Sequence, residues 1–155
     1  MGRLSQRFPI ITSRIRSSVT MTADERIEHS RTRITKLVFP QDTNPIGTLY
    51  GGTAMKWMDE VAFLTATRFA RRQVVTVSMD RVDFKTPIPR GHIVELLGEV
   101  TRVGNTSVTV TVSILCEDPL SGTQQLAIQG ELVMVAVDET MQPVQVIPES
   151  QGRDS

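Results

Sequence analysis

A glycine-rich turn that leads straight into a long apolar segment constrains this chain more than any other feature. Residues 44–69 read NPIGTLYGGTAMKWMDEVAFLTATRF. From Thr53 onward the stretch has no glycine or proline, which predicts a helix ending near residues 68–72, where basic side chains suit the negative end of its dipole. Gly51–Gly52 allows close backbone approach at the positive end of that helix, where negative charge is stabilised. An acidic pair, Asp59–Glu60, lies in its apolar middle.

The segments around this helix alternate between apolar and polar residues, as half-buried strands do. Before the helix, residues 31–39 form a β-branched run that Pro40 ends. After it, four further strands are predicted, at residues 73–84, 93–103, 107–116 and about 123–137. Gly104–Asn105 is a strong signal for a two-residue hairpin between two of them.

One long helix and five strands, joined mostly by hairpins, predict an α+β fold with a single antiparallel sheet. The helix is apolar on several faces, so the sheet has to curve around it to bury it. Long alternating strands also leave sheet edges that favour pairing with another chain. We therefore expect a homo-oligomer.

Composition and charge exclude several classes of protein. The 155 residues include 17 basic and 17 acidic side chains, which does not favour a nucleic-acid partner. The single cysteine, Cys116, cannot form an internal disulfide and suits a reducing compartment, so a cytoplasmic location is expected. His29 and His92 are too few for a zinc site, and no apolar run approaches the roughly 18–20 residues that cross a membrane.

The two ends of the chain differ from its middle. Residues 1–30 are predicted to form a flexible basic tail, with an organelle transit peptide and a true start at Met21 as alternatives. Within this tail, Thr22–Glu25 matches a capping box and predicts a short helical turn near residues 23–29. The folded domain is predicted at residues 31–139, followed by a polar C-terminal tail over residues 140–155.

Two motifs relate this chain to a known family. The segment PQDTNPIGTLYGGTAMKWMDEVA resembles the signature loop and helix of the acyl-CoA thioesterases of the YciA and cytosolic acyl-CoA hydrolase group. The similarity continues through VVTVSMDRVDFKTPIPRGHIV and TRVGNTSVTVTV, and it covers roughly residues 32–139. The resemblance implies the hotdog fold, in which a curved antiparallel sheet of about five strands wraps a long central helix. It also implies hydrolysis of acyl-CoA to free CoA and a carboxylic acid, without a metal or an organic cofactor.

The resemblance assigns roles to residues of the loop and helix. Asp59 stands at the position of the family's catalytic carboxylate, a general base or nucleophile, although the residues alone equally allow a solvated acidic pair. Asn44 matches an asparagine that positions the attacking water in a site shared with the partner protomer, and Asn-Pro is also a common turn. Gly51 and Gly52 match the glycine pair whose backbone N–H binds the thioester carbonyl oxygen.

Substrate contacts follow from the same resemblance. Tyr50, where relatives often carry His or Phe, is expected to line the acyl pocket. The backbone of residues 76–78 is expected to edge the tunnel, the hairpin at residues 104–107 to contact CoA, and Arg90 to meet its phosphates. Glycine–asparagine is also simply what a hairpin needs. The complete set of expected contacts is Tyr50, Thr76, Val77, Ser78, Arg90, Gly104, Asn105, Thr106 and Ser107.

Two other functions are compatible with the same fold. A hydratase or dehydratase would carry a histidine near the helix start, and the loop at residues 44–52 has none. A non-catalytic acyl-CoA-binding regulatory protein would keep the pocket without the base, and the presence of Asp59 and Asn44 argues against it. The resemblance further implies a dimer with two composite sites, and assembly into a trimer of dimers.

Overall fold

The computed structural model describes residues 21–149. The predictions made for residues 1–20, including the transit peptide, and for residues 150–155 lie outside this range. The elements in chain order are α1 (Ala23–Ser30), β1 (Thr32–Leu37), a 3-10 turn (Pro40–Asp42), α2 (Gly51–Ala70), β2 (Gln73–Phe84), β3 (Ile93–Val103), β4 (Ser107–Glu117) and β5 (Gln124–Val137).

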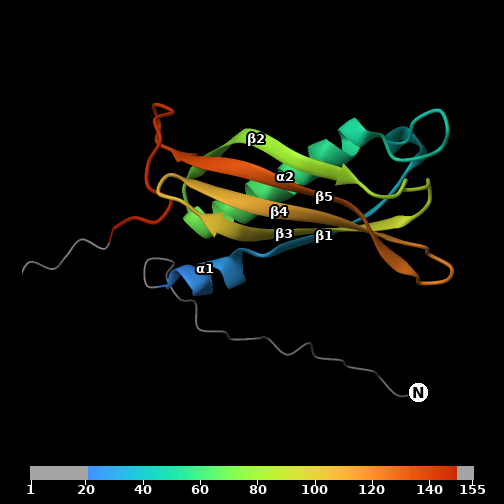
Figure 1. The fold of residues 1–155 in the computed structure, drawn as a ribbon, viewed down its shortest axis with the longest axis horizontal. Helices are drawn as coiled ribbons and strands as arrows, with labels where there is room; N and C mark the ends of the chain where they lie inside the picture. The colour runs from blue at the N-terminus through green and yellow to red at the C-terminus, as the bar shows by residue number, and fades with distance from the viewer. Residues whose placement is uncertain (1–20, 150–155) are drawn as a thin grey trace, which may run out of the picture.

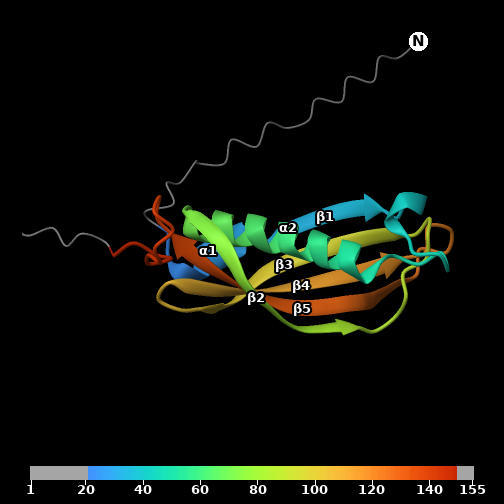
Figure 2. The same ribbon diagram turned by 90° about the horizontal axis from the view of Figure 1, so that it is seen from above.

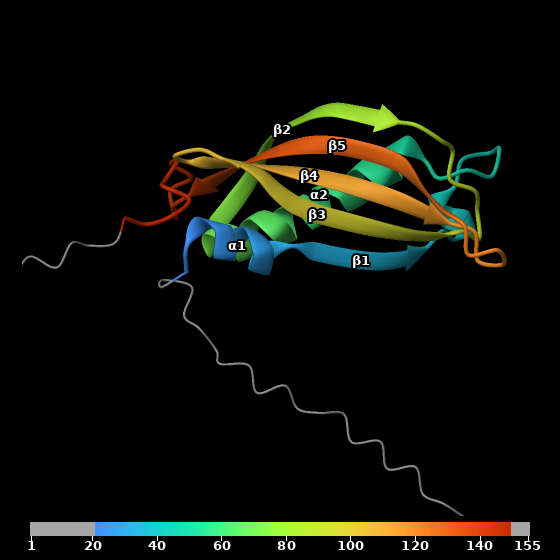
Figure 3. The same ribbon diagram turned by 60° about the horizontal axis from the view of Figure 1, so that its bottom comes forward.

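The five strands form one antiparallel sheet in the order β1-β3-β4-β5-β2. Helix α2 lies along one face of this sheet, which curves over it (Figures 1, 2 and 3). The edges of the sheet are β1 and β2. The architecture confirms the predicted α+β hotdog fold of about five strands around a long central helix.

The core lies between α2 and the concave face of the sheet. On β4, Val108, Val110, Val112 and Ile114 are each at most 1% exposed, as their alternation predicted. On α2, the buried residues are Ala54, Trp57, Met58, Val61, Ala62, Thr65, Ala66, Phe69 and Ala70. Burying each large apolar side chain of this kind contributes roughly 1.5–3 kcal/mol. Apolar burial between one helix and one sheet therefore dominates the fold.

One side of α2 is left uncovered within the chain. Met55, Phe63 and Leu64 are 38%, 47% and 41% exposed. The expectation of a helix buried on several faces was therefore wrong for a single chain, because one curved sheet covers only one side of a cylinder. The uncovered side borders the edge strand β2, on which Val77 is 56% exposed.

The N-terminal part of the fold starts earlier than predicted. The capping box forms, since the Glu25 N–H donates to Thr22 Oγ1 at 3.2 Å and the Thr22 N–H to Glu25 Oε2 at 2.9 Å. Arg26 of the resulting helix is only 6% exposed and donates from Nη1 to the Phe69 carbonyl at 3.0 Å. The positively charged guanidinium thereby donates a hydrogen bond to a carbonyl that the C-terminal, negative end of α2 leaves unpaired. Residues 22–30 are thus packed against the fold.

Two further boundaries differ from the prediction. Helix α2 begins at Gly51 and not at Thr53, because the glycine pair adopts helical geometry and supplies its first turn. Beyond β5, part of the predicted C-terminal tail packs on the domain. The Val144 N–H donates to the Ala136 carbonyl at 2.9 Å, and Val146 is 1% exposed.

Close approach of α2 to the sheet depends on Gly98 of β3. A Cβ atom at this position would meet Thr65 Oγ1 and would lie 2.7 Å from Val61 Cγ1. Both side chains belong to the buried face of α2, and neither has free space to retreat into. The absence of a side chain at Gly98 therefore sets how near the helix lies to the sheet.

We expect Gly98→Ala to lower the free energy of unfolding by about 1–3 kcal/mol, the usual cost of overpacking a core. Urea titration at fixed protein concentration measures this. A double variant that adds Thr65→Ala removes one of the two clashing side chains and should regain part of the loss. Wild-type stability of Gly98→Ala would contradict the role given to this close contact.

Candidate active site

The N-terminus of α2 offers backbone N–H groups to a ligand. No side chain of the described residues 21–149 caps the helix at Tyr50. Its first hydrogen bond runs from the Ala54 N–H to the Tyr50 carbonyl at 2.9 Å. Within residues 21–149, no acceptor is found for the N–H groups of Gly51, Gly52 and Thr53. A Cβ atom at Gly52 would have nothing within 4 Å, so its backbone is open to approach. Free N–H groups at a helix start suit a carbonyl oxygen that gains negative charge.

Asn44 organises the turn that precedes this helix. Its Oδ1 accepts from the N–H groups of Ile46 and Thr48, each at 3.1 Å, and its Nδ2 donates to Thr48 Oγ1 at 2.8 Å. These bonds use the acceptor oxygen and leave one amide hydrogen for another partner. No hydrogen bond joins Asn44 to Asp59 in the part of the chain that the structure describes.

Asp59 is held by a strand residue. Thr76 on β2 donates a hydrogen bond from Oγ1 to Asp59 Oδ1 at 2.6 Å. This is a short bond to a carboxylate, which fixes the side chain and leaves Oδ2 free to accept a proton. The sequence predicted that Thr76 contributes only strand backbone, so its side-chain role was missed.

Ordinary strand alternation brings Thr76 to this position, since Val74, two residues earlier on β2, lies in the core at 5% exposure. Thr76 pairs with Met134 of β5, whereas Ser78 pairs with Val133, so Val77 has no counterpart. This β-bulge shifts the alternation of β2 after Thr76, so that Met79, three residues later, also packs against the core. No one-dimensional signal marks this bulge, because Val77 is an ordinary strand residue.

Asp59 borders an apolar cavity on the uncovered side of α2. The cavity has a volume of about 440 Å³, and its apolar walls are Ile34, Phe63 and Leu64. Lys36 also lines it, with its ammonium 5.0 Å from the centre of the Trp57 ring. A carboxylate between apolar walls and a strand hydroxyl is suited to accept a proton from a water that attacks an apolar acyl group.

The structure separates the predicted substrate contacts into two groups at opposite ends of the molecule. Arg90 lies in the loop before β3, near the start of α2. Its backbone N–H donates to the Gly47 carbonyl at 2.9 Å. The hairpin at residues 104–107 lies near the other end of α2, where the Thr106 carbonyl accepts from Ala136 at 2.9 Å (Figures 1 and 2). Asp59 and Thr76 lie between these groups.

The remaining predicted contacts have different surroundings. Tyr50 is 48% exposed at the start of α2. Val77 is exposed on the bulge, and Ser78 donates to Asp80 Oδ2 at 3.1 Å. One chain alone therefore does not gather the predicted contacts into a closed pocket.

Other reactive groups lie away from this site. Burial raises the pKa of the Cys116 thiol, which makes it a poor nucleophile. Hydrogen bonds from the N–H groups of Leu120 and Ser121 lower the pKa of Asp118, which stays 3.9 Å from His92 Nε2. Among residues 21–149, no three His, Cys, Asp or Glu side chains gather as a metal site would require. None of the helices in that range is both long and apolar enough to cross a membrane.

Comparisons with known proteins agree with this geometry. An uncharacterized acyl-CoA thioester hydrolase, YkhA of Bacillus subtilis, is 42% identical over 120 residues, covering 76% of this chain and 70% of that protein. The rat cytosolic acyl coenzyme A thioester hydrolase is 28% identical and matches over 81% of this chain but only 34% of its own length.

Solved structures give the same result. The acyl-CoA hydrolase of Staphylococcus aureus, in complex with butyryl coenzyme A, superposes with a TM-score of 0.74 at 39% identity, covering 77% of this chain and 73% of that one. An apo-hexameric acyl-CoA thioesterase superposes with a TM-score of 0.74 at 44% identity, covering 81% and 82%. Residues 46–123 match the model of the thioesterase superfamily. The resemblance to acyl-CoA thioesterases is thereby confirmed, and the chain belongs to the thioesterase superfamily.

Proposed function

We propose that this protein hydrolyses acyl-CoA to free CoA and a carboxylic acid, with Asp59 as the general base. The observation that carries the proposal is the Asp59 carboxylate, held by Thr76 at 2.6 Å beside an apolar cavity. The uncapped start of α2 lies on the same helix, about two turns earlier. The names of the relatives and of the solved structures support the same activity.

The reaction uses each of these groups once. Asp59 Oδ2 takes a proton from a water molecule, whose oxygen bonds to the thioester carbon. The carbonyl oxygen becomes an oxyanion that accepts hydrogen bonds from the N–H groups at Gly51 and Gly52, each such donor contributing about 3–4 kcal/mol. The carbon–sulfur bond then breaks, and the CoA sulfur leaves with the electron pair and takes the proton from Asp59. No metal or organic cofactor enters these steps. Direct attack by the carboxylate is the alternative for the first step.

The spacing of three residues supports their assignment. Solved structures of the Staphylococcus aureus hydrolase include alanine variants of one asparagine, one aspartate and one threonine. In that enzyme the asparagine precedes the aspartate by 15 residues, and the threonine follows it by 17. Asn44, Asp59 and Thr76 have the same two spacings.

Self-association is part of the proposal. Exposed apolar side chains lie on the uncovered side of α2, at Met55, Phe63 and Leu64, and on the edge strand β2, at Val77 and Phe84. We propose that a second copy covers this surface and that its Asn44 holds the attacking water with the free amide hydrogen. The hexameric acyl-CoA thioesterases among the structural neighbours support a trimer of dimers. The cytosolic relative supports a cytoplasmic location.

Asp59→Asn keeps the hydrogen bond from Thr76 but removes the basic oxygen. We expect kcat to fall by about 10²–10⁴, the usual contribution of a general base. A thiol-release assay with acyl-CoAs of several chain lengths measures this. Glu60→Gln removes the neighbouring carboxylate and should cost far less. Equal losses in the two variants would contradict the assignment of the base, and acyl-CoA binding without turnover in the wild type would favour a regulatory protein.

Thr76→Val removes the hydroxyl at nearly constant volume. Hydrogen bonds to charged groups contribute about 1.5–3 kcal/mol, so kcat should fall by roughly 10- to 100-fold while KM changes less. Thr76→Ser restores the donor and should regain most of the activity. If Thr76→Ser is as slow as Thr76→Val, then restoring the hydroxyl restores no activity, and loss of the hydrogen bond to Asp59 does not explain the slow turnover.

A composite site can be tested by mixing inactive proteins. Asn44→Ala and Asp59→Ala each damage both sites of their own dimers. After unfolding and refolding together, hybrid dimers hold one site with an intact Asp59 and the partner's intact asparagine. About a quarter of the wild-type activity should return if the chains pair randomly. Unchanged inactivity, together with native mass spectrometry that shows hybrids of one size-tagged and one untagged variant, would place both residues in one chain.

A further inference from the structure

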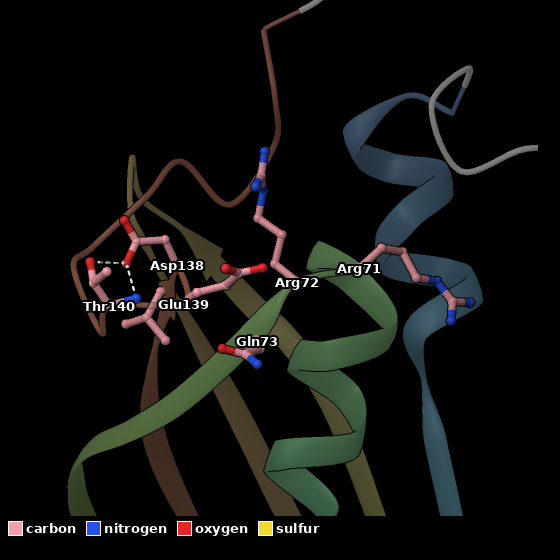
Figure 4. A pocket seen from close by; sticks show the side chains of 7 residues that line it. Arg71, Arg72, Gln73, Asp138, Glu139 and Thr140 are labelled. Carbon is pink, nitrogen blue, oxygen red and sulfur yellow. Dashed lines mark hydrogen bonds between the residues drawn. The ribbon is translucent and has the colours of Figure 1, made fainter.

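The two ends of helix α2 have different surroundings. Its C-terminal end borders a cavity of about 590 Å³, whose lining is polar or charged apart from Val137. Figure 4 shows these side chains where α2 ends, beside the turn that follows β5: Arg71, Arg72, Gln73, Asp138, Glu139 and Thr140. The start of α2 is flanked instead by the aromatic ring of Phe84, the last residue of β2. Polar side chains hold water near them, whereas a ring displaces it.

The ring of Phe84 lies against the first residue of α2. A Cβ atom at Gly51 would lie 3.5 Å from Phe84 Cε1 and 3.6 Å from Cζ, which is ordinary van der Waals contact. The Cα–Cβ bond of a helical residue tilts toward the N-terminus of its helix, and the N–H groups of the first turn point the same way. The ring therefore stands beside the N–H groups of Gly51 and Gly52, for which residues 21–149 supply no acceptor.

Backbone hydrogen bonds after Phe84 hold the ring in this position. The Lys85 N–H donates to the Ala127 carbonyl of β5 at 2.8 Å. Four residues after Phe84, the Ile88 carbonyl accepts from the Leu49 N–H at 2.8 Å, two residues before α2 begins. The segment that follows Phe84 is thus tied to the sheet at one end and to the turn before α2 at the other.

A register shift in β2 turns Phe84 toward the helix. Met79 and Val82 both pack against the core although three residues separate them, because the pairing with β5 shifts between residues 80 and 83. Within this shift, Arg81 has a left-handed φ of 52°. Phe84 follows Val82 by two residues and therefore lies on the same face of the strand, toward α2.

Half of the ring stays uncovered within the chain. Phe84 is 52% exposed, and a Cβ atom at Gly52 would have nothing within 4 Å. The space beside the unpaired N–H groups is therefore open to a ligand, and the ring forms one apolar wall of it. A bound thioester would cover that wall and remove its apolar surface from water.

We infer that Phe84 is a positioning residue for thioester hydrolysis, whose ring keeps water away from the N–H groups of Gly51 and Gly52 while they bind the oxyanion. This inference rests on the proposed function and adds a residue to it. Hydrogen bonds to a charged oxygen are stronger where water is absent, because the effective dielectric constant is lower. Water at the same N–H groups would compete for them and weaken their effect on the transition state.

Phe84→Ala opens this wall. We expect the single-turnover rate to fall about tenfold, less than the roughly 10²–10³ that the loss of an oxyanion donor costs, while KM changes less than about threefold. Phe84→Leu keeps an apolar side chain and should stay within about threefold of the wild type. Phe84→Gln has a similar size but is polar, and it should be as slow as Phe84→Ala. Equal rates of the leucine and glutamine variants, or a raised KM at an unchanged rate, would overturn the inference.

Phe39→Ala is the matched control. Phe39 is 49% exposed, and no atom of it lies within 4 Å of a Cβ atom placed at Gly51 or Gly52. Its truncation should leave the single-turnover rate within about twofold, and a loss equal to that of Phe84→Ala would contradict the role of the ring. Light scattering completes the comparison, because a lower molar mass of Phe84→Ala would assign the ring to self-association and overturn the inference.

Infrared spectroscopy separates this inference from the proposed function, since it requires binding but no turnover. The probe is acyl-CoA with an isotope-labelled thioester carbonyl, bound to Asp59→Asn. We expect its carbonyl band at a lower frequency than in the free thioester, because the N–H groups polarise the bond, and we expect Phe84→Ala to move it back toward the free value. If the wild type hydrolyses no thioester but this shift is seen, the proposed activity fails and the role of Phe84 stands. An unshifted band, or one that Phe84→Ala leaves in place, overturns the inference.

Discussion

The packing of α2 against the concave face of the sheet is the constraint on which the rest of the structure depends. Because Gly98 has no side chain, α2 can lie close to β3. A Cβ atom at this position would collide with the side chains of Thr65 and Val61. Arg26 of α1 then satisfies a carbonyl at the far end of the helix at 3.0 Å. With its position and its end fixed in this way, α2 can carry functional groups along a rigid axis: free N–H groups at its start and Asp59 on its open side.

Covering only one side of α2 has a direct functional consequence. A single sheet buries about half of the helix, and the remaining half is apolar around Asp59. Thr67 of the same helix has a buried hydroxyl for which residues 21–149 supply no hydrogen-bond partner. An apolar surface with unpaired polar groups is costly in water, so a substrate and a second protomer together supply what one chain lacks. We regard substrate binding and self-association in this protein as two uses of one surface.

Local patterns predicted most of the elements accurately. The bounds of β2 and β3 were predicted to the residue, because Pro, Gly and hairpin signals end each alternating run. The errors arose where a long-range contact decides the outcome. Residues 22–30 looked like a basic tail, but Arg26 finds the carbonyl of Phe69, 43 residues away. Val146 looked like part of a polar tail, but its N–H reaches the Asn105 carbonyl at 3.0 Å, and the side chain is buried.

The sequence by itself determined the fold class, the family and the position of Asp59 two turns into an apolar helix, since all three depend on periodicity and on a contiguous motif. Tertiary structure decided what surrounds that carboxylate. Thr76 reaches Asp59 across 17 residues because β2, paired with β5, lies beside α2, and strand pairing decides which strand lies there. Tertiary structure also placed Arg90 and the 104–107 hairpin at opposite ends of α2. The distance between two residues of a sheet protein depends on strand pairing, which spacing along the chain does not encode.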